Sequence, residues 1–190
     1  AQNVASVTIA GEPDTSDAIS GLPRQSASQR LFYLPGLPGV CRAELEIMRQ
    51  NMLDWDVVGL PYATLAARLG DECTVTRLAA SLACGLQQIQ HEGPYVLVGY
   101  SLGALLACEI ARMFEAEGQE VIALVLLDPP EIMPAAKRDD NERLRRILER
   151  VSDAKNMEAA AMVRATTSLW SVADGTTPIA VQAPVLHVRA

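Results

Sequence analysis

The sequence predicts an α/β fold, and three patterns along its 190 residues indicate it. Short runs of apolar and β-branched residues recur, and they are typical of strands that are buried on both faces. Segments with apolar residues at helical spacing follow most of these runs. Pro and Gly stand at the junctions, where turns are expected. This alternation predicts a mostly parallel sheet with helices on both faces.

Residues 1–30 are expected to form a linker or tail. They are rich in Ser, Ala, Gln, Asp, Gly and Pro, a composition too polar to build a core. The segment is either a tether within a larger polypeptide or a loose tail left after processing. The folded domain is therefore placed at residues 31–190.

The first half of that domain is expected to contain two strands and two helices. The expected elements are a strand at Leu31–Gly36, a helix at Ala43–Met52, a short strand within residues 54–62, and a helix at residues 71–90. Asp71 and Glu72 are expected at the N-terminal end of the last helix, where the helix dipole favours negative charge.

The second half continues the alternation. The expected elements are a strand at Pro94–Gly99, a helix at Ser101–Gly118 closed by its glycine, a strand at Glu120–Pro130, and a final core strand within residues 183–190. Residues 131–180 lie between the last two strands and contain segments with helical spacing.

Composition excludes several classes of function. A net charge of −7 and a pI near 4.8 argue against a nucleic-acid-binding surface. No segment reaches the roughly 18 apolar residues of a membrane span, and the N-terminus has no secretory pattern. The four cysteines have no CxxC spacing and no nearby histidine, which predicts no metal site. We therefore expect a soluble, cytoplasmic protein whose thiols are reduced and mostly buried.

The segment Gly99–Gly103, GYSLG, carries the strongest chemical signal. Between a strand and a helix, the chain must turn sharply at Ser101, and Gly99 and Gly103 remove Cβ atoms that would collide there. Such a turn, with Tyr100 before the serine, exposes the Ser101 hydroxyl and directs the backbone N–H of Leu102 toward a developing oxyanion. The pattern is typical of the nucleophile elbow of α/β-hydrolases. The alternative is a serine that only caps the helix, but the strand before it and the helix after it favour a nucleophile.

Two further groups fit around this serine. The loop PGLPG at Pro35–Gly39 follows the first strand, and we assign the second oxyanion donor to the backbone N–H of Leu37. The alternative for this loop is an ordinary Pro-Gly turn. Asp128 ends a later strand, where it either orients a catalytic imidazole or caps a turn before proline. The residues alone leave both roles of Asp128 open.

The segments LFYLPG, GYSLGALLACEIA and VIALVLLDPP resemble the thioesterase domains at the end of polyketide synthase and non-ribosomal peptide synthetase assembly lines. The resemblance covers roughly residues 30–190. It implies Ser101 as the nucleophile and Asp128 as its acid. It also implies a substrate held as a thioester on the phosphopantetheine of an acyl or peptidyl carrier protein in the same polypeptide. Release would occur by hydrolysis or macrocyclisation, with no metal and no directly bound cofactor.

The resemblance also implies that residues 131–180 form a helical lid. One expected lid helix carries a basic cluster of Arg143, Arg145, Arg146 and Arg150. This cluster either meets the acidic carrier protein or its phosphate, or is a solvated face with acidic partners.

The catalytic base is missing from the pattern, because the chain has only two histidines. His91 precedes the strand that leads to Ser101 and is expected at the opposite edge of the sheet. His187 lies within the last strand and is expected to be partly buried against a covering helix. In the family that this chain resembles, the catalytic histidine follows this strand. We therefore expect the histidine beyond Ala190, and we expect that the chain lacks the C-terminal part of the domain.

Two other functions remain open. One is a carboxylesterase of the same fold that acts on free esters, and the other is a non-catalytic fragment that binds a carrier protein. Self-association into a homodimer is also open, and the acyl group cannot be deduced from these residues.

Overall fold

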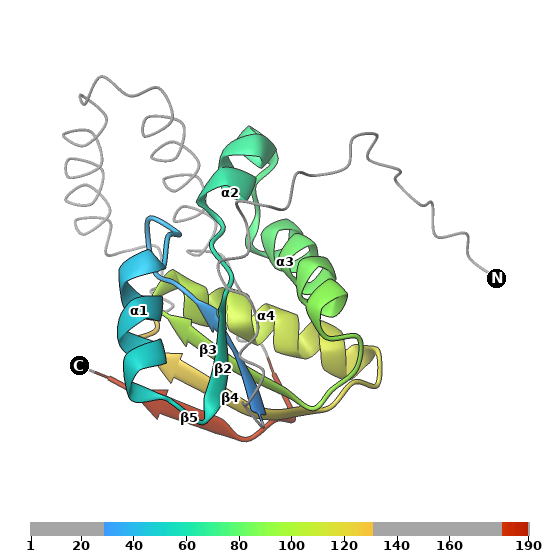
Figure 1. The fold of residues 1–190 in the computed structure, drawn as a ribbon. Coiled ribbons are helices and arrows are strands. Elements are labelled where there is room, and N and C mark those ends of the chain that lie inside the picture. The colour runs from blue at the N-terminus through green and yellow to red at the C-terminus, as the bar shows by residue number, and fades with distance from the viewer. Residues whose placement is uncertain (1–28, 131–179, 190) are drawn as a thin grey trace.

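The computed structural model describes residues 29–130 and 180–189, in which a parallel sheet carries helices on both faces (Figure 1). The elements are β1 (Gln29–Leu34), α1 (Arg42–Asn51), β2 (Trp55–Gly59), α2 (Ala63–Leu69), a 3-10 turn (Gly70–Glu72), α3 (Val75–Ile89), β3 (Tyr95–Tyr100), α4 (Leu102–Ala116), β4 (Val121–Leu127) and β5 (Val185–Val188). The strands lie in the order β2-β1-β3-β4-β5, and every neighbouring pair is parallel. The predicted α/β class is confirmed.

Alternate side chains of the central strands enter two separate cores. In β1, Phe32 and Leu34 pack in the core beneath α3 and α4, whereas Leu31 and Tyr33 pack toward α1. Successive side chains of a strand point to opposite faces, so a strand covered on both faces is apolar throughout. That is why the central strands read as continuous apolar runs in the sequence.

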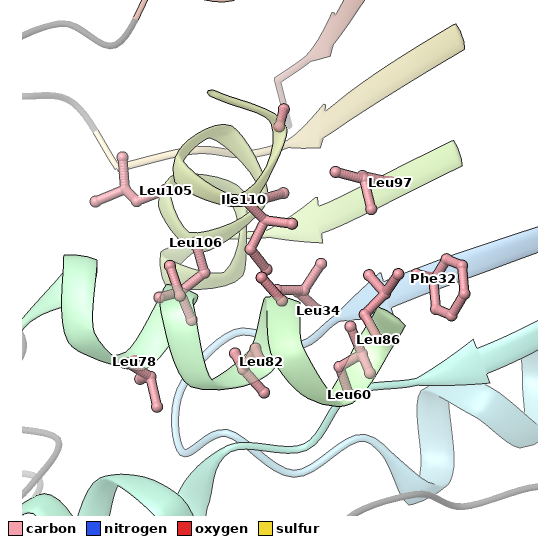
Figure 2. Packing of buried hydrophobic residues seen from close by; sticks show 14 of the residues in the cluster. Phe32, Leu34, Leu60, Leu78, Leu82, Leu86, Leu97, Leu105, Leu106 and Ile110 are labelled. Atoms are coloured by element: carbon pink, nitrogen blue, oxygen red, sulfur yellow. The ribbon is translucent and has the colours of Figure 1, made fainter. Parts of the chain in front are cut away.

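The larger core lies between the sheet and the pair α3 and α4 (Figure 2). Leu78, Leu82 and Leu86 recur at helical spacing on α3 and face the sheet and α4, where Leu106 and Ile110 are fully buried. Full burial of one such side chain contributes about 1.5–3 kcal/mol. Helix α4 is therefore held firmly behind β3, and the turn that joins these two elements is fixed in place.

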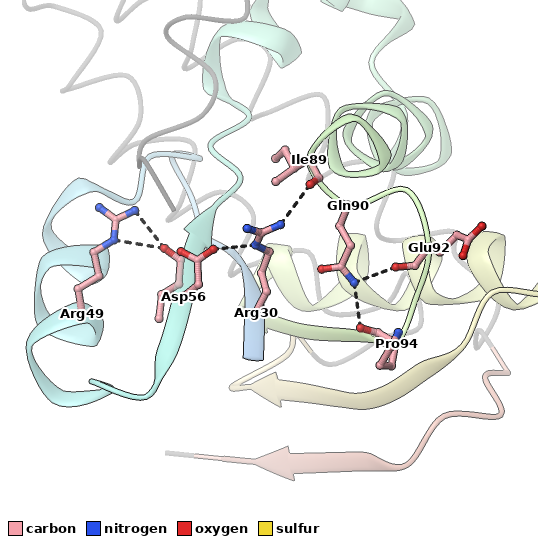
Figure 3. A network of polar contacts seen from close by, with 8 residues as sticks. Arg30, Arg49, Asp56, Ile89, Gln90, Glu92 and Pro94 are labelled. Carbon is pink, nitrogen blue, oxygen red and sulfur yellow. Dashed lines mark hydrogen bonds and ion pairs between the residues drawn. The ribbon is translucent and has the colours of Figure 1, made fainter. Parts of the chain in front are cut away.

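A polar network ties the elements together at the N-terminal ends of the strands (Figure 3). The guanidinium of Arg30 donates to the Asp56 carboxylate at 2.7 Å and to the Ile89 carbonyl at 3.1 Å, and so links β1, β2 and the end of α3. The Arg49 guanidinium donates to the Val57 carbonyl and links α1 to β2. These contacts serve the scaffold, because they lie at the end of the sheet away from Ser101.

The start of α3 differs from the prediction. The helix begins at Val75, and its N-cap is Thr74, whose side chain accepts a hydrogen bond from the Arg77 N–H. Asp71 and Glu72 belong to the preceding 3-10 turn, so α3 has no acidic residue in its first turn. The prediction of acidic residues at this helix end was wrong, because a hydroxyl that bonds a backbone N–H directly fixes the start. Helix α2 was not predicted.

The last strand also differs from the prediction. β5 pairs with β4, but all four of its side chains are exposed. The expectation that His187 is partly buried against a helix was wrong, because no described helix covers β5. Its apolar side chains, such as Leu186 at 60% exposure, lie at one edge of the described sheet.

The remaining expectations are only partly covered. Residues 1–28 of the expected linker and residues 131–179 of the expected lid, with its basic cluster, lie outside the described residues. Gln29 and Arg30 were expected in the linker but belong to β1, because they pair with β2. The four cysteines are free thiols, of which Cys41 and Cys73 are buried, Cys108 is partly buried and Cys84 is exposed. Within the described ranges, no helix is long and apolar enough to cross a membrane.

Candidate active site

Ser101 lies at a strained turn between β3 and α4. Its φ of 50° and ψ of −120° place it in a region that residues with a side chain rarely adopt. Such a conformation costs on the order of 1–3 kcal/mol and persists only when the surroundings impose it. Here the Ser101 N–H donates to the Leu127 carbonyl at 2.9 Å, and the buried helix α4 fixes the other side. The predicted sharp turn between strand and helix at Ser101 is therefore present.

The two glycines of the elbow permit close backbone contacts. A Cβ on Gly99 would overlap backbone atoms of Gly103 and Ala104, and a Cβ on Gly103 would overlap the carbonyl oxygens of Leu34 and Pro35. Glycine is thus required at both positions so that α4 can start directly against the ends of β1 and β3. The prediction that a Cβ atom at Gly99 or Gly103 would collide with the backbone is thus confirmed.

The hydroxyl of Ser101 is not used for structure. It makes no capping hydrogen bond at the start of α4, so the alternative of a helix cap does not describe this residue. Leu102 is the first residue of α4, and its N–H has no acceptor within the helix. The half-buried hydroxyl of Ser101 and the N–H of Leu102, which has no acceptor within the helix, therefore belong to neighbouring residues of the same turn.

The loop after β1 lies against the elbow. A Cβ built on Gly36 would lie 3.2 Å from the Ser101 Cβ and 2.8 Å from Cδ1 of Tyr100. Leu37 follows directly, and the turn closes where the Gly39 N–H donates to the Gly36 carbonyl at 2.8 Å. The structure thus brings the loop predicted to carry the second oxyanion donor to the serine.

Asp128 lies beside the serine, one strand over. β3 and β4 pair up to Tyr100 and Leu127, so Ser101 and Asp128 occupy the next positions on neighbouring strands. Asp128 also has a positive φ, 44°, and its N–H donates to the Val188 carbonyl at 2.7 Å. Its side chain is exposed at the same edge as the serine.

These groups meet where the strand order reverses. β1 is followed by β2 on one side, while β3, β4 and β5 extend on the other. At such a reversal, open parallel sheets bind ligands at the carboxyl ends of the strands, and Ser101, Asp128 and the loop after β1 all lie there. The position supports a binding site independently of the residue types.

Neither histidine reaches this edge. His91 lies in the turn before β3, where the Gln90 amide donates to the carbonyls of Glu92 and Pro94 at 3.0 Å each (Figure 3). The six residues of β3 then separate it from Ser101 by about 20 Å. This confirms the predicted placement of His91.

His187 lies nearer but still outside the site. It pairs with Leu126 of β4, which pairs with Gly99 of β3. Two strand spacings make about 10 Å between His187 and Gly99, and both residues precede the edge where Ser101 lies. Within the described residues, no group of three or more His, Cys, Asp or Glu side chains could hold a metal ion.

Comparison with known proteins places these features in a family. A family model described as thioesterase domain matches residues 50–176, more than half of the chain. Norsolorinic acid synthase stcA of Emericella nidulans is 37% identical over 120 residues, which cover 62% of this chain and 5% of that protein. Enterobactin synthase component F of Escherichia coli K12 is 34% identical over 131 residues, which cover 64% of this chain and 10% of that protein. The chain thus spans a tenth or less of these relatives.

A solved structure agrees at the level of the fold. The NocB thioesterase domain, in a covalent complex with a fluorophosphonate nocardicin G analog, superimposes with a TM-score of 0.70 at 23% identity. The match covers 85% of this chain and 72% of that one. At this identity the likeness concerns the arrangement of the strands and helices.

Proposed function

This chain belongs to the thioesterase domain family and has the α/β-hydrolase fold, and we propose that it releases acyl or peptidyl chains from a carrier protein through a covalent intermediate on Ser101. The observation that carries the proposal is the strained elbow, where Ser101 keeps a hydroxyl without a capping role. Strain of this kind gathers at functional sites, where it aims a reactive group.

In the first step, the Ser101 Oγ attacks the thioester carbonyl carbon and its proton passes to a general base. The carbon–sulfur bond then breaks, and the thiolate of the phosphopantetheine leaves and takes up that proton. The N–H groups of Leu37 and Leu102 donate to the oxyanion between these events. The helix N-terminus adds its positive dipole to the Leu102 donor.

Asp128 orients the base and stabilises its cationic form in this proposal. Support comes from its place beside Ser101 on the neighbouring strand. Since His91 and His187 lie away from this edge, we propose that the base is a histidine supplied by a part of the protein outside these residues.

In the second step, water or a hydroxyl or amine of the acyl chain attacks the Ser101 ester. The product leaves as an acid, a lactone or a lactam, and Ser101 regains its proton. The chemistry needs no metal and no directly bound cofactor, because the leaving thiol arrives with the substrate.

A carrier protein in the same polypeptide is the proposed partner. The relatives are named as synthases, and each is much longer than the matched segment. Free thiols among the described residues further support a reducing, cytoplasmic compartment.

A fluorophosphonate probe tests the nucleophile in the full-length protein. We expect the probe to label Ser101, and Ser101→Ala to abolish labelling while the thermal unfolding temperature stays unchanged. Labelling of the Ser101→Ala variant at the rate of the unmodified protein would remove Ser101 from the mechanism.

The substrate class is tested by comparing rates on the same acyl group. An acyl chain on the carrier protein should be released faster than the same chain as a small free ester, because docking of the carrier adds binding energy that the ester lacks. A carboxylesterase would instead release the free ester at least as fast, and a non-catalytic protein would release neither.

A further inference from the structure

The second oxyanion donor depends on how one short turn is held. In Gly36–Gly39 the first and last residues are joined by the 2.8 Å hydrogen bond from the Gly39 N–H to the Gly36 carbonyl. Leu37 lies inside this turn, and its partly buried side chain packs against the core beneath α3 and α4. The direction of the Leu37 N–H therefore depends on this side-chain contact and on what holds the two glycines at the ends of the turn.

Gly39 packs against the ring of Tyr62, a residue that follows β2. A Cβ on Gly39 would lie 2.7 Å from both Cδ2 and Cε2 of that ring, so the bare Cα packs directly against it. The φ of Gly39 is 86°, a conformation that favours glycine. The Gly39 carbonyl accepts hydrogen bonds from the N–H groups of Tyr62 at 2.9 Å and Ala63 at 3.2 Å. The ring and two backbone bonds thus fix this end of the turn.

The other end of the turn lies against the elbow. Gly36 packs against the ring of Tyr100 and the Cβ of Ser101. Tyr62 therefore contacts Gly39 at one end of the turn, and Gly36 at the other end contacts Ser101. A shift of Gly39 would therefore move the Leu37 N–H and change its distance from the oxyanion.

The ring of Tyr62 matters here, and its hydroxyl does not. The residue is 1% exposed and packs in the core beneath α3 and α4. Among the described residues, its hydroxyl is the buried side-chain group that lacks a hydrogen-bond partner. Burial of an unsatisfied hydroxyl costs free energy, so this group adds nothing to the stability of the turn.

We propose that Tyr62 is a positioning residue for the reaction, which holds the backbone N–H of Leu37 at the oxyanion through the contact of its ring with Gly39. The inference rests on the proposed function of Ser101. It adds Tyr62, from the segment between β2 and α2, to a site otherwise built from the ends of β1, β3 and β4.

The test compares variants of the full-length protein on an octanoyl thioester of N-acetylcysteamine. Tyr62→Leu removes the ring under Gly39, and Gly39→Ala pushes a methyl group into it. Loss of one oxyanion donor lowers kcat by roughly 10²–10³-fold, so a displaced donor should lower kcat by at least ~10-fold in each variant. KM should change little, because the donor acts on the transition state. The double variant should be little slower than either single one, since both changes act through one contact.

Two matched controls separate positioning from stability. Tyr62→Phe keeps the ring and removes the unpartnered hydroxyl, and it should retain kcat within ~2-fold. Phe114→Leu removes an equally buried ring from the same core at the far end of α4. It should lower the unfolding temperature as Tyr62→Leu does, but leave kcat unchanged.

The outcomes distinguish the two hypotheses. Failure of the fluorophosphonate to label the unmodified protein at Ser101 would overturn the proposed function and this inference with it. Labelling of Ser101 together with a normal kcat in Tyr62→Leu and Gly39→Ala would overturn the inference alone. An equal loss of kcat in Phe114→Leu would also overturn it, because stability would then explain the effect.

Discussion

Two residues other than glycine hold a positive φ in the described residues, and both end strands at the same edge. Ser101 follows β3 and Asp128 follows β4, and each donates its N–H to the next strand of the sheet. The sheet ladder therefore imposes the strained backbone on both. Because strain of this kind gathers at functional sites, the shared geometry supports the proposal that Asp128 acts together with Ser101.

Close packing at the elbow predicts an unequal response to two similar mutations. Gly103→Ala would place a methyl group against the Leu34 and Pro35 carbonyls and should lower the free energy of unfolding by about 1–3 kcal/mol. Gly85→Ala lies within α3, where a Cβ meets no atom within 4 Å, and should raise it by about 0.5–1 kcal/mol. Equilibrium unfolding in urea measures both. Equal effects of the two variants would mean that α4 does not start as close to β1 as described.

Buried thiols predict a loss of stability at high pH. Burial raises the pKa of Cys41 and of Cys73 from 9.0 to about 11, with Glu44 adding to the effect at Cys41. A raised pKa in the folded state favours the neutral thiol, so this stability is present below pH 9 and is lost as the pH rises through about 11. The free energy of unfolding should therefore fall across this window.

Substitution of single cysteines isolates that effect. Cys73→Ala should make the decline between pH 9 and pH 11 less steep, whereas substitution of the exposed Cys84 by serine should leave it unchanged. A slope that is identical in both variants would show that Cys73 does not titrate in this window. Only the slope is compared, because the smaller side chain in Cys73→Ala also lowers stability at every pH.

At the scale of elements, side-chain patterns predicted most helices and strands but not where each begins. The stripe of Leu78, Leu82 and Leu86 predicted α3, since burial of one face determines that the helix forms. Its start depends on a single hydrogen bond from the Arg77 N–H to Thr74, which no periodicity reveals. Helix α2 was missed because its seven residues are too few to show a clear period.

The cap at Thr74 can be tested against the acidic residue that was expected to matter. Thr74→Ala removes the hydrogen bond to the Arg77 N–H and should lower the free energy of unfolding by about 1 kcal/mol. Glu72→Gln removes an ion pair with Arg77 in which both side chains are more than half exposed, and such pairs contribute little. A larger loss of unfolding free energy in Glu72→Gln than in Thr74→Ala would mean that the negative charge, and not the cap, mainly determines where α3 begins.

At the scale of the whole molecule, the site depends on the strand order, which is set by long-range pairing. The sequence pointed to Ser101, Leu37 and Asp128 as candidates one by one, because each follows a recognisable strand. That β1 lies between β2 and β3, and so brings the Leu37 loop to Ser101, follows only from the tertiary fold. The contribution of Tyr62 could not be predicted for the same reason.

The exposure of β5 has the same origin. Its apolar residues are typical of a buried strand, but burial depends on which helices lie over that part of the sheet. Helix α4 packs against β3 and β4, and the described helices stop there. The pattern predicted the strand correctly and its surroundings incorrectly.

A carboxylate on α4 holds the segment that leads into β5. Glu115 accepts hydrogen bonds from the N–H of Gln182 through both oxygens, at 2.9 Å, and from the N–H of Ala183 at 2.8 Å. The Leu124 N–H then donates to the Pro184 carbonyl and starts the ladder between β4 and β5. Since the side chains of β5 are exposed, these bonds to charged and backbone groups are a large part of what holds the strand.

Removal of that carboxylate should release β5 without unfolding the rest. Hydrogen bonds to charged groups contribute about 1.5–3 kcal/mol, so Glu115→Ala should speed amide exchange of residues 182–188 by at least ~10-fold. Exchange in β1 and β3 should not change, because their cores do not involve β5. Glu117→Ala is the matched control, since Glu117 accepts one exposed hydrogen bond from Gln87 and does not contact β5. Faster exchange throughout the sheet in Glu115→Ala would mean that β5 unfolds together with the whole domain.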